Sequence, residues 1–385
     1  KTETRRLELI RGGLRVVLSN ALPTITDTVI IDGSSEPDYV SSPVVEINGA
    51  SAGDVNGLEF TGGDGSIIKG LSITGFDGAT AGMAIFVNGP DDFVIQGNYI
   101  GVKTDGITAE GNRTGIDIKN NSDDHLIGGT NAAERNIISG NEYGISISDS
   151  TTRRNQVLGN YIGVNADNSS NLGNSRFGIF VWNDAQDNVI GGVNAGEGNL
   201  ITGNRDGVVV NDAAIGNSIR GNQIYGNAES NLALNVLDSV TPNDADDSDT
   251  GPNNLQNYPV LSSAVSDGVN IIVAGSLQSL AAANTYNIDF YAAGTPAANA
   301  HGGAERYVGT LSVTTDASGL ATISAVLPAS GVNVGDIITA TATDASGNTS
   351  EFAANINVSA APKAQQALLF STEKDVTSRH CRSAG

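Results

Sequence analysis

The chain has 385 residues, of which 48 are glycine and 5% are aromatic, a composition typical of turn-rich β proteins. Its net charge of −22 argues against nucleic acid as a partner, because an acidic surface repels phosphates. We find no run of about 18 apolar residues and expect no membrane span. The single cysteine, Cys381, cannot form an intrachain disulfide.

The N-terminal segment, residues 1–26, is basic and contains two apolar runs, 7–10 and 14–18. We expect it to form a strand or a short amphipathic piece that covers the N-terminal end of the repeats described next. From residue 27 onward, short apolar runs alternate with Gly, Asn, Asp and Ser. This pattern predicts strands of three to five residues separated by turns.

A block of chain is duplicated in register between residues 98 and 222. The phrase Asn-Tyr-Ile-Gly-Val at 98–102 returns at 160–164, and Ile-Gly-Gly at 127–129 returns at 190–192. Fixed-period repetition of this kind indicates a repeat architecture.

Three kinds of strand recur inside the block, which predicts a parallel β-helix with three strands per rung over residues 27–240. The first kind begins with asparagine and has isoleucine two residues later, at Asn98, Asn136, Asn160, Asn199 and Asn222. The other two kinds begin at Gly115, Gly144, Gly178 and Gly207, and at His125, Gln156, Asn188 and Ser218. Because each strand pairs with the rung above, about 4.8 Å away, we expect the asparagines to form a ladder of side-chain amides that also satisfies buried backbone groups.

The repeats end near residue 240. Residues 241–258 form a proline-flanked acidic linker, and residues 259–360 contain about seven wider-spaced alternating strands, as in an immunoglobulin-like β-sandwich. Residues 361–385 lack a matching strand pattern and are interpreted as a C-terminal tail.

Taken together, the Asn-Tyr-Ile-Gly-Val and Ile-Gly-Gly-Thr-Asn-Ala phrases, Arg-Asn-Ile-Ile-Ser-Gly-Asn at 135–141, and the segment 249–260 resemble the bacterial right-handed parallel β-helix repeat proteins that end in an Ig-like domain. The resemblance covers residues 20–360. It implies a pectin-lyase-like fold and a secreted or cell-surface location, but no particular chemistry.

Three aspartates, Asp149, Asp184 and Asp212, follow the glycine-led strand on consecutive rungs. Their rung spacing of about 5 to 10 Å covers the carboxylate separations used in glycoside hydrolysis, so they are the candidate catalytic residues of a polysaccharide-degrading enzyme. Aspartate and asparagine are also the usual residues of tight turns, and this interpretation is favoured. Three aromatic residues that point away from the isoleucine core, Trp182, Tyr99 and Tyr161, are candidates for a sugar-stacking face, although an edge aromatic that covers its neighbour is the favoured interpretation.

Calcium is the expected cofactor, if there is one. Asp244, Asp246, Asp247 and Asp249 place four carboxylates within six residues of the acidic linker, although the pattern is not an EF-hand. A solvated acidic linker is the alternative.

The sequence therefore favours an extracellular or cell-surface structural or adhesive protein, a rigid solenoid whose partners are copies of itself or an extracellular glycan. The first 15 residues carry five basic and two acidic side chains, the last 25 four and two, and the remainder is strongly acidic. Basic ends on an acidic rod favour head-to-tail assembly into filaments. The alternative is a glycoside hydrolase or lyase that uses an acidic groove on the β-helix.

Overall fold

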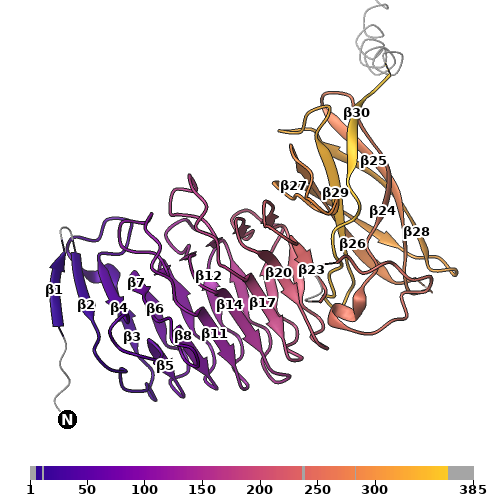
Figure 1. Ribbon diagram of the computed structural model, residues 1–385. Coiled ribbons are helices and arrows are strands. Elements are labelled where there is room, and N and C mark those ends of the chain that lie inside the picture. The colour runs from indigo at the N-terminus through magenta and orange to yellow at the C-terminus, as the bar shows by residue number, and fades with distance from the viewer. Residues whose placement is uncertain (1–5, 11–12, 236–238, 282, 363–385) are drawn as a thin grey trace, which may run out of the picture.

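The structure is a computed structural model that describes residues 6–10, 13–235, 239–281 and 283–362. The chain first winds into a parallel β-solenoid of about seven turns, with three strands on each complete turn, and then forms a β domain at the end of the solenoid (Figure 1). Each of the three strand kinds expected from the sequence builds one sheet. The predicted parallel β-helix is thus confirmed.

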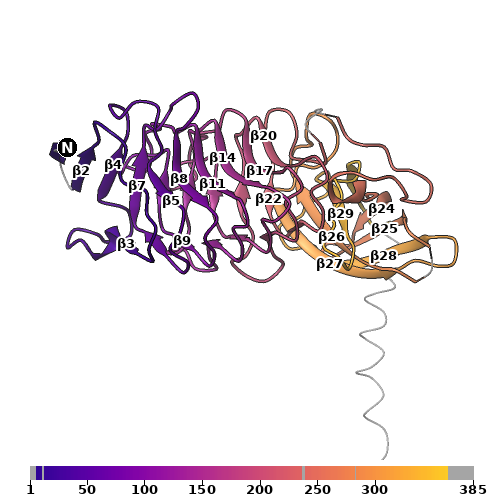
Figure 2. The same ribbon diagram turned by 90° about the horizontal axis from the view of Figure 1, so that it is seen from below.

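The three solenoid sheets run side by side along the axis (Figure 2). The asparagine-led sheet contains β1 (Arg6–Ile10), β2 (Gly13–Val17), β4 (Val45–Asn48), β7 (Leu71–Thr74), β10 (Tyr99–Ile100), β13 (Ile137–Ile138), β16 (Tyr161–Ile162), β19 (Leu200–Ile201) and β22 (Gln223–Ile224). The glycine-led sheet contains β5 (Leu58–Phe60), β8 (Met83–Asn88), β11 (Thr114–Lys119), β14 (Tyr143–Ser148), β17 (Phe177–Trp182), β20 (Asp206–Val210) and β23 (Leu232–Ala233). The third sheet contains β3 (Ile30–Asp32), β6 (Ile67–Lys69), β9 (Val94–Gln96), β12 (Leu126–Gly128), β15 (Gln156–Leu158), β18 (Val189–Gly191) and β21 (Ser218–Arg220), and a 3₁₀ turn, η1 (Gly33–Ser35), follows β3.

Columns of isoleucine fill the interior of the solenoid. Strand register places each inward isoleucine directly on that of the next rung, as for Ile100 on Ile138 and Ile138 on Ile162. These three side chains are fully buried. The alternation of inward and outward residues leaves every second side chain of a strand on the outer surface.

Buried asparagine ladders run along the corners of the solenoid, as expected for the first column. The Oδ1 atom of Asn160 accepts hydrogen bonds from the backbone N (3.2 Å) and the Nδ2 atom (2.9 Å) of Asn136 one rung below, and its own Nδ2 donates to the carbonyl of Ile127 (2.9 Å). The sequence predicted one such ladder, but the described residues form three. The second consists of Asn112, Asn141, Asn174, Asn204 and Asn227, and the third of Asn155, Asn188, Asn217 and Asn253.

Glycine is required where the backbone turns beside a ladder. Gly128 has φ = +85°, and a Cβ atom there would lie 2.1 Å from the carbonyl oxygen of Leu158 and 2.5 Å from Oδ1 of Asn160. Any other residue would displace the ladder amide.

The C-terminal β domain contains β24 (Val260–Ser266), β25 (Asn270–Gln278), β26 (Thr285–Ala293), β27 (Arg306–Thr314), β28 (Leu320–Pro328), β29 (Ile337–Thr343) and β30 (Ile356–Ala360). The strand order is β27-β26-β29-β30-β24-β25-β28, and β30 pairs in parallel with β24 but antiparallel with β29. The domain has its own buried core around residues such as Ile288, Phe290 and Ile323.

The C-terminal domain closes the end of the solenoid. Tyr291 and Phe352 belong to the solenoid's own hydrophobic core. All three sheets find a hydrogen-bond partner in the domain: Ile219 N donates to Thr349 Oγ1 (2.9 Å), Ile224 N to the carbonyl of Ala304 (2.9 Å) and Leu234 N to Glu351 Oε1 (3.2 Å). At this end of the solenoid, the backbone N–H groups of Ile219, Ile224 and Leu234 are therefore already paired and are not open to another chain.

Two further contacts fix the domain to the last rung. Asn253, in the 3₁₀ segment η2 (Pro252–Leu255), extends the third ladder by accepting from Asn217 N (3.0 Å). Arg220 forms a bidentate ion pair with the fully buried Asp289, with Nε–Oδ2 at 2.6 Å and NH2–Oδ1 at 2.9 Å. Both contacts lie at the junction, so the domain and the solenoid pack as one unit.

At the N-terminal end, β1 pairs antiparallel with β2, and β2 pairs in parallel with β4. Parts of the expected N-terminal cap (1–5 and 11–12) and of the expected C-terminal tail (363–385) lie outside the described residues. Within the described part of the chain, no helix is long and apolar enough to cross a membrane.

The ladders predict a large loss of stability when one amide is removed. We expect Asn160→Ala to lower the free energy of unfolding by about 1–3 kcal/mol, because the backbone N–H of Asn136 would be buried without an acceptor. Urea unfolding followed by circular dichroism measures the change. Asn20→Ala, at an exposed asparagine, is the control and should have little effect; equal destabilisation by both substitutions would contradict a role of the ladder.

The junction predicts a pH dependence of stability. Burial raises the pKa of Glu351 from 4.5 to about 7, although the backbone N–H groups of Thr241 and Leu234 oppose this shift. A raised pKa means that the folded state binds the proton more tightly, so this contribution is present below pH 4.5 and is lost as the pH rises to about 7. The loss is on the order of 3 kcal/mol.

Unfolding measured from pH 4.5 to pH 8 tests this expectation. Glu351→Gln should remove most of this pH dependence, whereas Glu229→Gln, at an exposed site, should retain it. An unchanged pH profile in Glu351→Gln would show that other groups are responsible.

Candidate functional site

The three candidate catalytic aspartates lie at the turns that follow β14, β17 and β20. Asp149, Asp184 and Asp212 all have positive φ, at 83°, 66° and 58°. One oxygen of each accepts a backbone hydrogen bond from a neighbouring rung: Asp149 from Asn120 N (3.2 Å), Asp212 from Asn183 N (2.9 Å) and Asp184 from Ala213 N (3.1 Å). The register thus places Asp149 and Asp212 in one turn column with Asn120 and Asn183, and Asp184 one residue beyond that column; all three carboxylates bond one rung to the next.

The acidic run of the linker is brought together in part. Carboxylate oxygens of Asp244, Asp247 and Asp249 lie within 4.8 Å of one another, whereas Asp246 is outside this group and exposed. Asp247 is buried, and its oxygens accept hydrogen bonds from Asn257 N (2.8 Å), from Gln256 Nε2 (2.7 Å) and from the hydroxyl group of Ser279. Burial raises the pKa of both Asp247 and Asp249, and the negative charge of Asp244 adds to the effect in each case.

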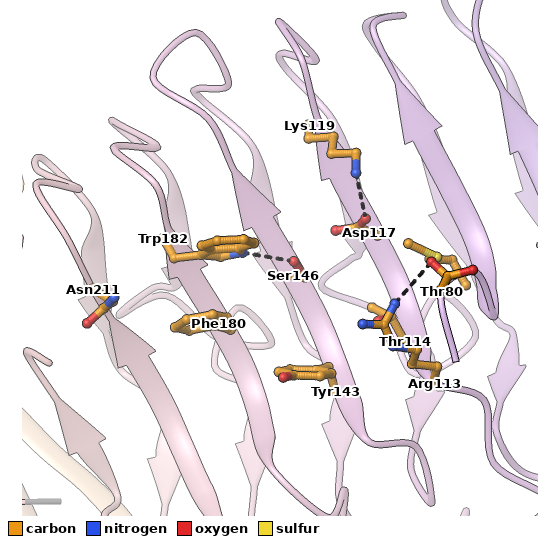
Figure 3. Close-up of a pocket in the computed structure, with 11 residues that line it drawn as sticks. Thr80, Arg113, Thr114, Asp117, Lys119, Tyr143, Ser146, Phe180, Trp182 and Asn211 are labelled. Atoms are coloured by element: carbon orange, nitrogen blue, oxygen red, sulfur yellow. Dashed lines mark hydrogen bonds and ion pairs between the residues drawn. The ribbon is translucent and has the colours of Figure 1, made fainter. Parts of the chain in front are cut away.

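A groove lies on the outer face of the glycine-led sheet, and none of the three aspartates is among its lining residues (Figure 3). We call it the aromatic groove. Its volume of about 520 Å³ is within the range of ligand-binding clefts, roughly 300–1,000 Å³. Its lining residues are Thr80, Met83, Arg113, Thr114, Asp117, Lys119, Tyr143, Ser146, Phe180, Trp182 and Asn211.

Three aromatic rings form one side of the groove. The rings of Phe180 and Trp182 are stacked with centroids 5.4 Å apart and planes 8° apart, and Tyr143 stacks on Phe180 at 6.4 Å and 25°. The indole N–H of Trp182 donates to Ser146 Oγ (3.2 Å), which fixes the ring orientation (Figure 3). Trp182 nevertheless remains 37% exposed. The outcome is a preorganised aromatic surface open to solvent.

The cation Arg176 packs against two aromatic rings at the edge of this stack. Its guanidinium carbon lies 5.0 Å from the ring centroid of Tyr143 and 5.5 Å from that of Phe177. Its NH1 nitrogen lies 3.6 Å from Oε1 of Glu142. Arg176 therefore holds the edge of the aromatic stack and is not a lining residue of the groove.

Charged side chains of β11 form the other side of the groove. Asp117 is only 6% exposed, and burial raises its pKa, which Lys119 partly offsets. The Nζ atom of Lys119 lies 3.8 Å from Asp117 Oδ2 and 4.8 Å from the centroid of Phe86. Arg113, just before β11, donates from NH1 to the carbonyl oxygen of Thr80 (3.3 Å). The arrangement can bind hydroxyl groups and anions, and a protonated Asp117 can donate a proton.

Sequence reasoning found Trp182 but missed Asp117, Lys119 and Arg113. Residues 117 and 119 alternate with inward isoleucines, so the sequence does indicate that they face outward. Their relation to the aromatic residues depends on the register Asp117–Ser146–Phe180, in which each residue pairs with the next rung. Aligning the glycine-led strands by their first glycine gives that same register. The sequence alone could therefore have placed Asp117 beside the aromatic residues.

Comparisons with known proteins do not assign this chain to a family. No protein-family model matches the sequence, and no curated protein matches it. The enzymatically active domain of bacteriophage CBA120 tailspike protein 2 is similar with 11% identity and a TM-score of 0.31, over 90% of this chain and 72% of that chain. The Dettilon tailspike protein is similar with 12% identity and a TM-score of 0.32, over 81% of this chain and 87% of that chain.

Full-length tailspike protein 2 from Escherichia coli O157:H7 bacteriophage CAB120 is similar with 13% identity and a TM-score of 0.22, and the chain spans about half (48%) of its length. At these identities and TM-scores, the similarities do not bear on the function of this protein.

Proposed function

We propose that the chain is a secreted or cell-surface adhesive protein that binds a glycan in the aromatic groove. The single observation that carries the proposal is the stacked pair of the half-buried Phe180 and the exposed Trp182 in an open groove. A pyranose ring presents an apolar face of C–H groups that packs on such a ring, while its hydroxyl groups need polar partners at the edge. Asp117, Ser146 and Asn211 supply those partners.

The scaffold suits this role. A ligand that binds to a rigid sheet face need not order a loop, and the Trp182–Ser146 hydrogen bond has already fixed the indole. The extracellular location is supported by the resemblance of the sequence motifs to secreted β-helix repeat proteins.

Self-association is a separate proposal. Head-to-tail stacking of open rungs needs two open ends, and the C-terminal domain covers one of them through contacts such as Ile224 N to the carbonyl of Ala304. We therefore favour glycan adhesion over filament formation. Light scattering at high protein concentration, with and without calcium, tests for assembly.

We further infer that residues 259–360 form an Ig-like β-sandwich. The first, second and fifth strands of the domain (β24, β25 and β28) are neighbours, and so are the third, sixth and seventh (β26, β29 and β30). This grouping corresponds to the A-B-E and C-F-G strands of seven-stranded Ig-like domains. Such a domain would act here as a spacer and an end cap.

Polysaccharide cleavage is the alternative function. Asp117 favours it, because a buried carboxyl group with a raised pKa is suited to act as a general acid. Asp149, Asp184 and Asp212 are the second candidate set, although one oxygen of each is engaged in a backbone hydrogen bond.

The proposal predicts that Trp182→Ala weakens glycan binding by about 2 kcal/mol, or roughly 30-fold, because a central aromatic contact is lost. Glycan-array binding followed by calorimetry on the best ligand measures the change. Ile107→Ala, which removes an exposed apolar side chain outside the groove, is the matched control.

Equal binding by both variants would rule out the groove as the binding surface. The same glycans should be assayed for newly formed chain ends. Cleavage that is lost in Asp117→Asn or in Asp184→Ala would support the enzymatic alternative at that residue, and absence of any cleavage would exclude it for the glycans used.

We also propose that Asp244, Asp247 and Asp249 bind calcium. Their oxygens are close enough to share one ion, and a buried oxygen of Asp249, Oδ1, has no hydrogen-bond partner among the described residues. Carboxylate oxygens are preferred ligands of Ca²⁺, and an ion would offset the repulsion from Asp244 that, after burial, raises the pKa of Asp247 and Asp249.

Calcium should therefore raise the melting temperature of the protein, since a ligand at 100 times its dissociation constant stabilises the folded state by about 2.7 kcal/mol. Differential scanning calorimetry with calcium or with a chelator measures the shift. Asp249→Asn should abolish it, and Asp246→Asn, outside the group, should retain it. No shift with calcium, or the same shift in both variants, would contradict the proposal.

A further inference from the structure

The aromatic groove is locally cationic on a strongly acidic protein. Its lining contains two cations, Arg113 and Lys119, and one carboxylate, Asp117, whereas the whole chain has a net charge of −22. A neutral sugar would not require this concentration of positive charge. The charge of the groove is thus a separate observation from its aromatic rings.

Arg113 is the more informative of the two cations. Most cations of the described residues form an ion pair, for example Lys69 with Asp32 at 3.1 Å and Arg15 with Glu46 at 3.3 Å. Arg113 has no carboxylate within 4.0 Å among the described residues, and its NH1 atom donates only to the backbone carbonyl of Thr80. Its remaining N–H donors are thus available to an anionic group, for which a guanidinium has a suitable fork of donors.

Lys119 is held only loosely. Its closest carboxylate oxygen, in Asp117, lies at 3.8 Å, beyond hydrogen-bond distance. Burial raises the pKa of Asp117, an effect that the charge of Lys119 partly offsets. The ammonium group can therefore bind an external anion without breaking a strong ion pair.

The two cations stand at opposite ends of β11, while the aromatic rings stand on β14 and β17 (Figure 3). Arg113 and Lys119 are six residue steps apart along extended chain, which is about 20 Å between their Cα atoms. One sugar ring cannot contact both. A chain of sugars that carries several negative charges can do so while one ring packs on Trp182.

We propose that the glycan bound in the aromatic groove is an anionic polysaccharide, whose carboxylate or sulfate groups pair with Arg113 and Lys119. This inference rests on the proposed glycan-binding function and specifies its ligand class. It explains why a protein that repels polyanions over most of its surface has exposed cations beside its aromatic stack.

Binding of the full-length chain to immobilised glycans tests the inference. The probes are polygalacturonate, the same polymer after reduction of its carboxyl groups, chondroitin sulfate, and desulfated chondroitin. We expect tight binding to polygalacturonate or chondroitin sulfate, at least about tenfold weaker binding to the reduced polymer, and a loss of affinity as salt increases. Comparison of the sulfated and desulfated polymers distinguishes sulfate from carboxylate as the recognised group.

The variants locate the interaction. Arg113→Gln combined with Lys119→Gln should weaken binding to the acidic glycan by about tenfold or more, because two charge-assisted contacts are lost. Lys69→Gln combined with Lys103→Gln changes the charge by the same amount away from the groove and should have little effect. Circular dichroism confirms folding of each variant.

The outcomes separate the two proposals. Equal binding to polygalacturonate and to its reduced form, with loss of both in Trp182→Ala, would overturn the anionic ligand but leave glycan binding in the groove intact. Anionic binding that weakens equally in the groove variant and in its control would assign the charge effect to the surface as a whole and also overturn the inference. Failure to bind any glycan would overturn the proposed function itself.

Discussion

The structure depends on the stacking of buried asparagine amides at the corners of the solenoid. Each amide oxygen accepts from the backbone N–H and the side chain of the rung below, so a buried turn needs neither water nor a long loop. His125 shows what the position demands. Its Nδ1 atom accepts from Phe93 N (2.9 Å), its backbone N donates to Asn155 (3.0 Å), and burial lowers its pKa to about 4, which keeps the ring neutral and able to accept.

A ladder cannot end without leaving polar groups unpaired, and this explains the close packing of the C-terminal domain on the solenoid. Asn253 takes the place of the next ladder residue, and Glu351 and Thr349 accept from the backbone of the last strands. The buried pair Arg220–Asp289 adds a directional contact, since either charge alone would be costly at this depth. The domain is therefore part of the solenoid's stability and not an independent attachment.

The sequence was sufficient to predict the strand kinds and the first ladder, because Asn98, Asn136 and Asn160 each precede the same apolar phrase. It did not reveal the other two ladders. Their members also precede recurring strands, Asn188 the strand β18 and Asn141 the strand β14, but those strands were identified from their glycines and apolar residues and not from the asparagine before them. The linker carboxylates were predicted as a set of four, but the bond from Asn257 N turns Asp247 inward and leaves Asp246 in solvent. Which aspartates of such a run turn inward depends on where the chain folds back, and the local sequence does not encode that position.

The groove has a different origin from the scaffold that carries it. In the column Phe86, Asp117, Ser146, Phe180 and Val209, the side chain changes from each rung to the next, whereas the inward neighbours are all isoleucine or valine. The outward column can vary because it takes no part in the amide ladders or in the isoleucine core inside the solenoid. Its members are nonetheless held one rung apart, about 4.8 Å, by the backbone pairing itself. A carboxyl group, a hydroxyl group and an aromatic ring thus obtain a fixed spacing from the fold, and recognition requires only the choice of side chains along one column.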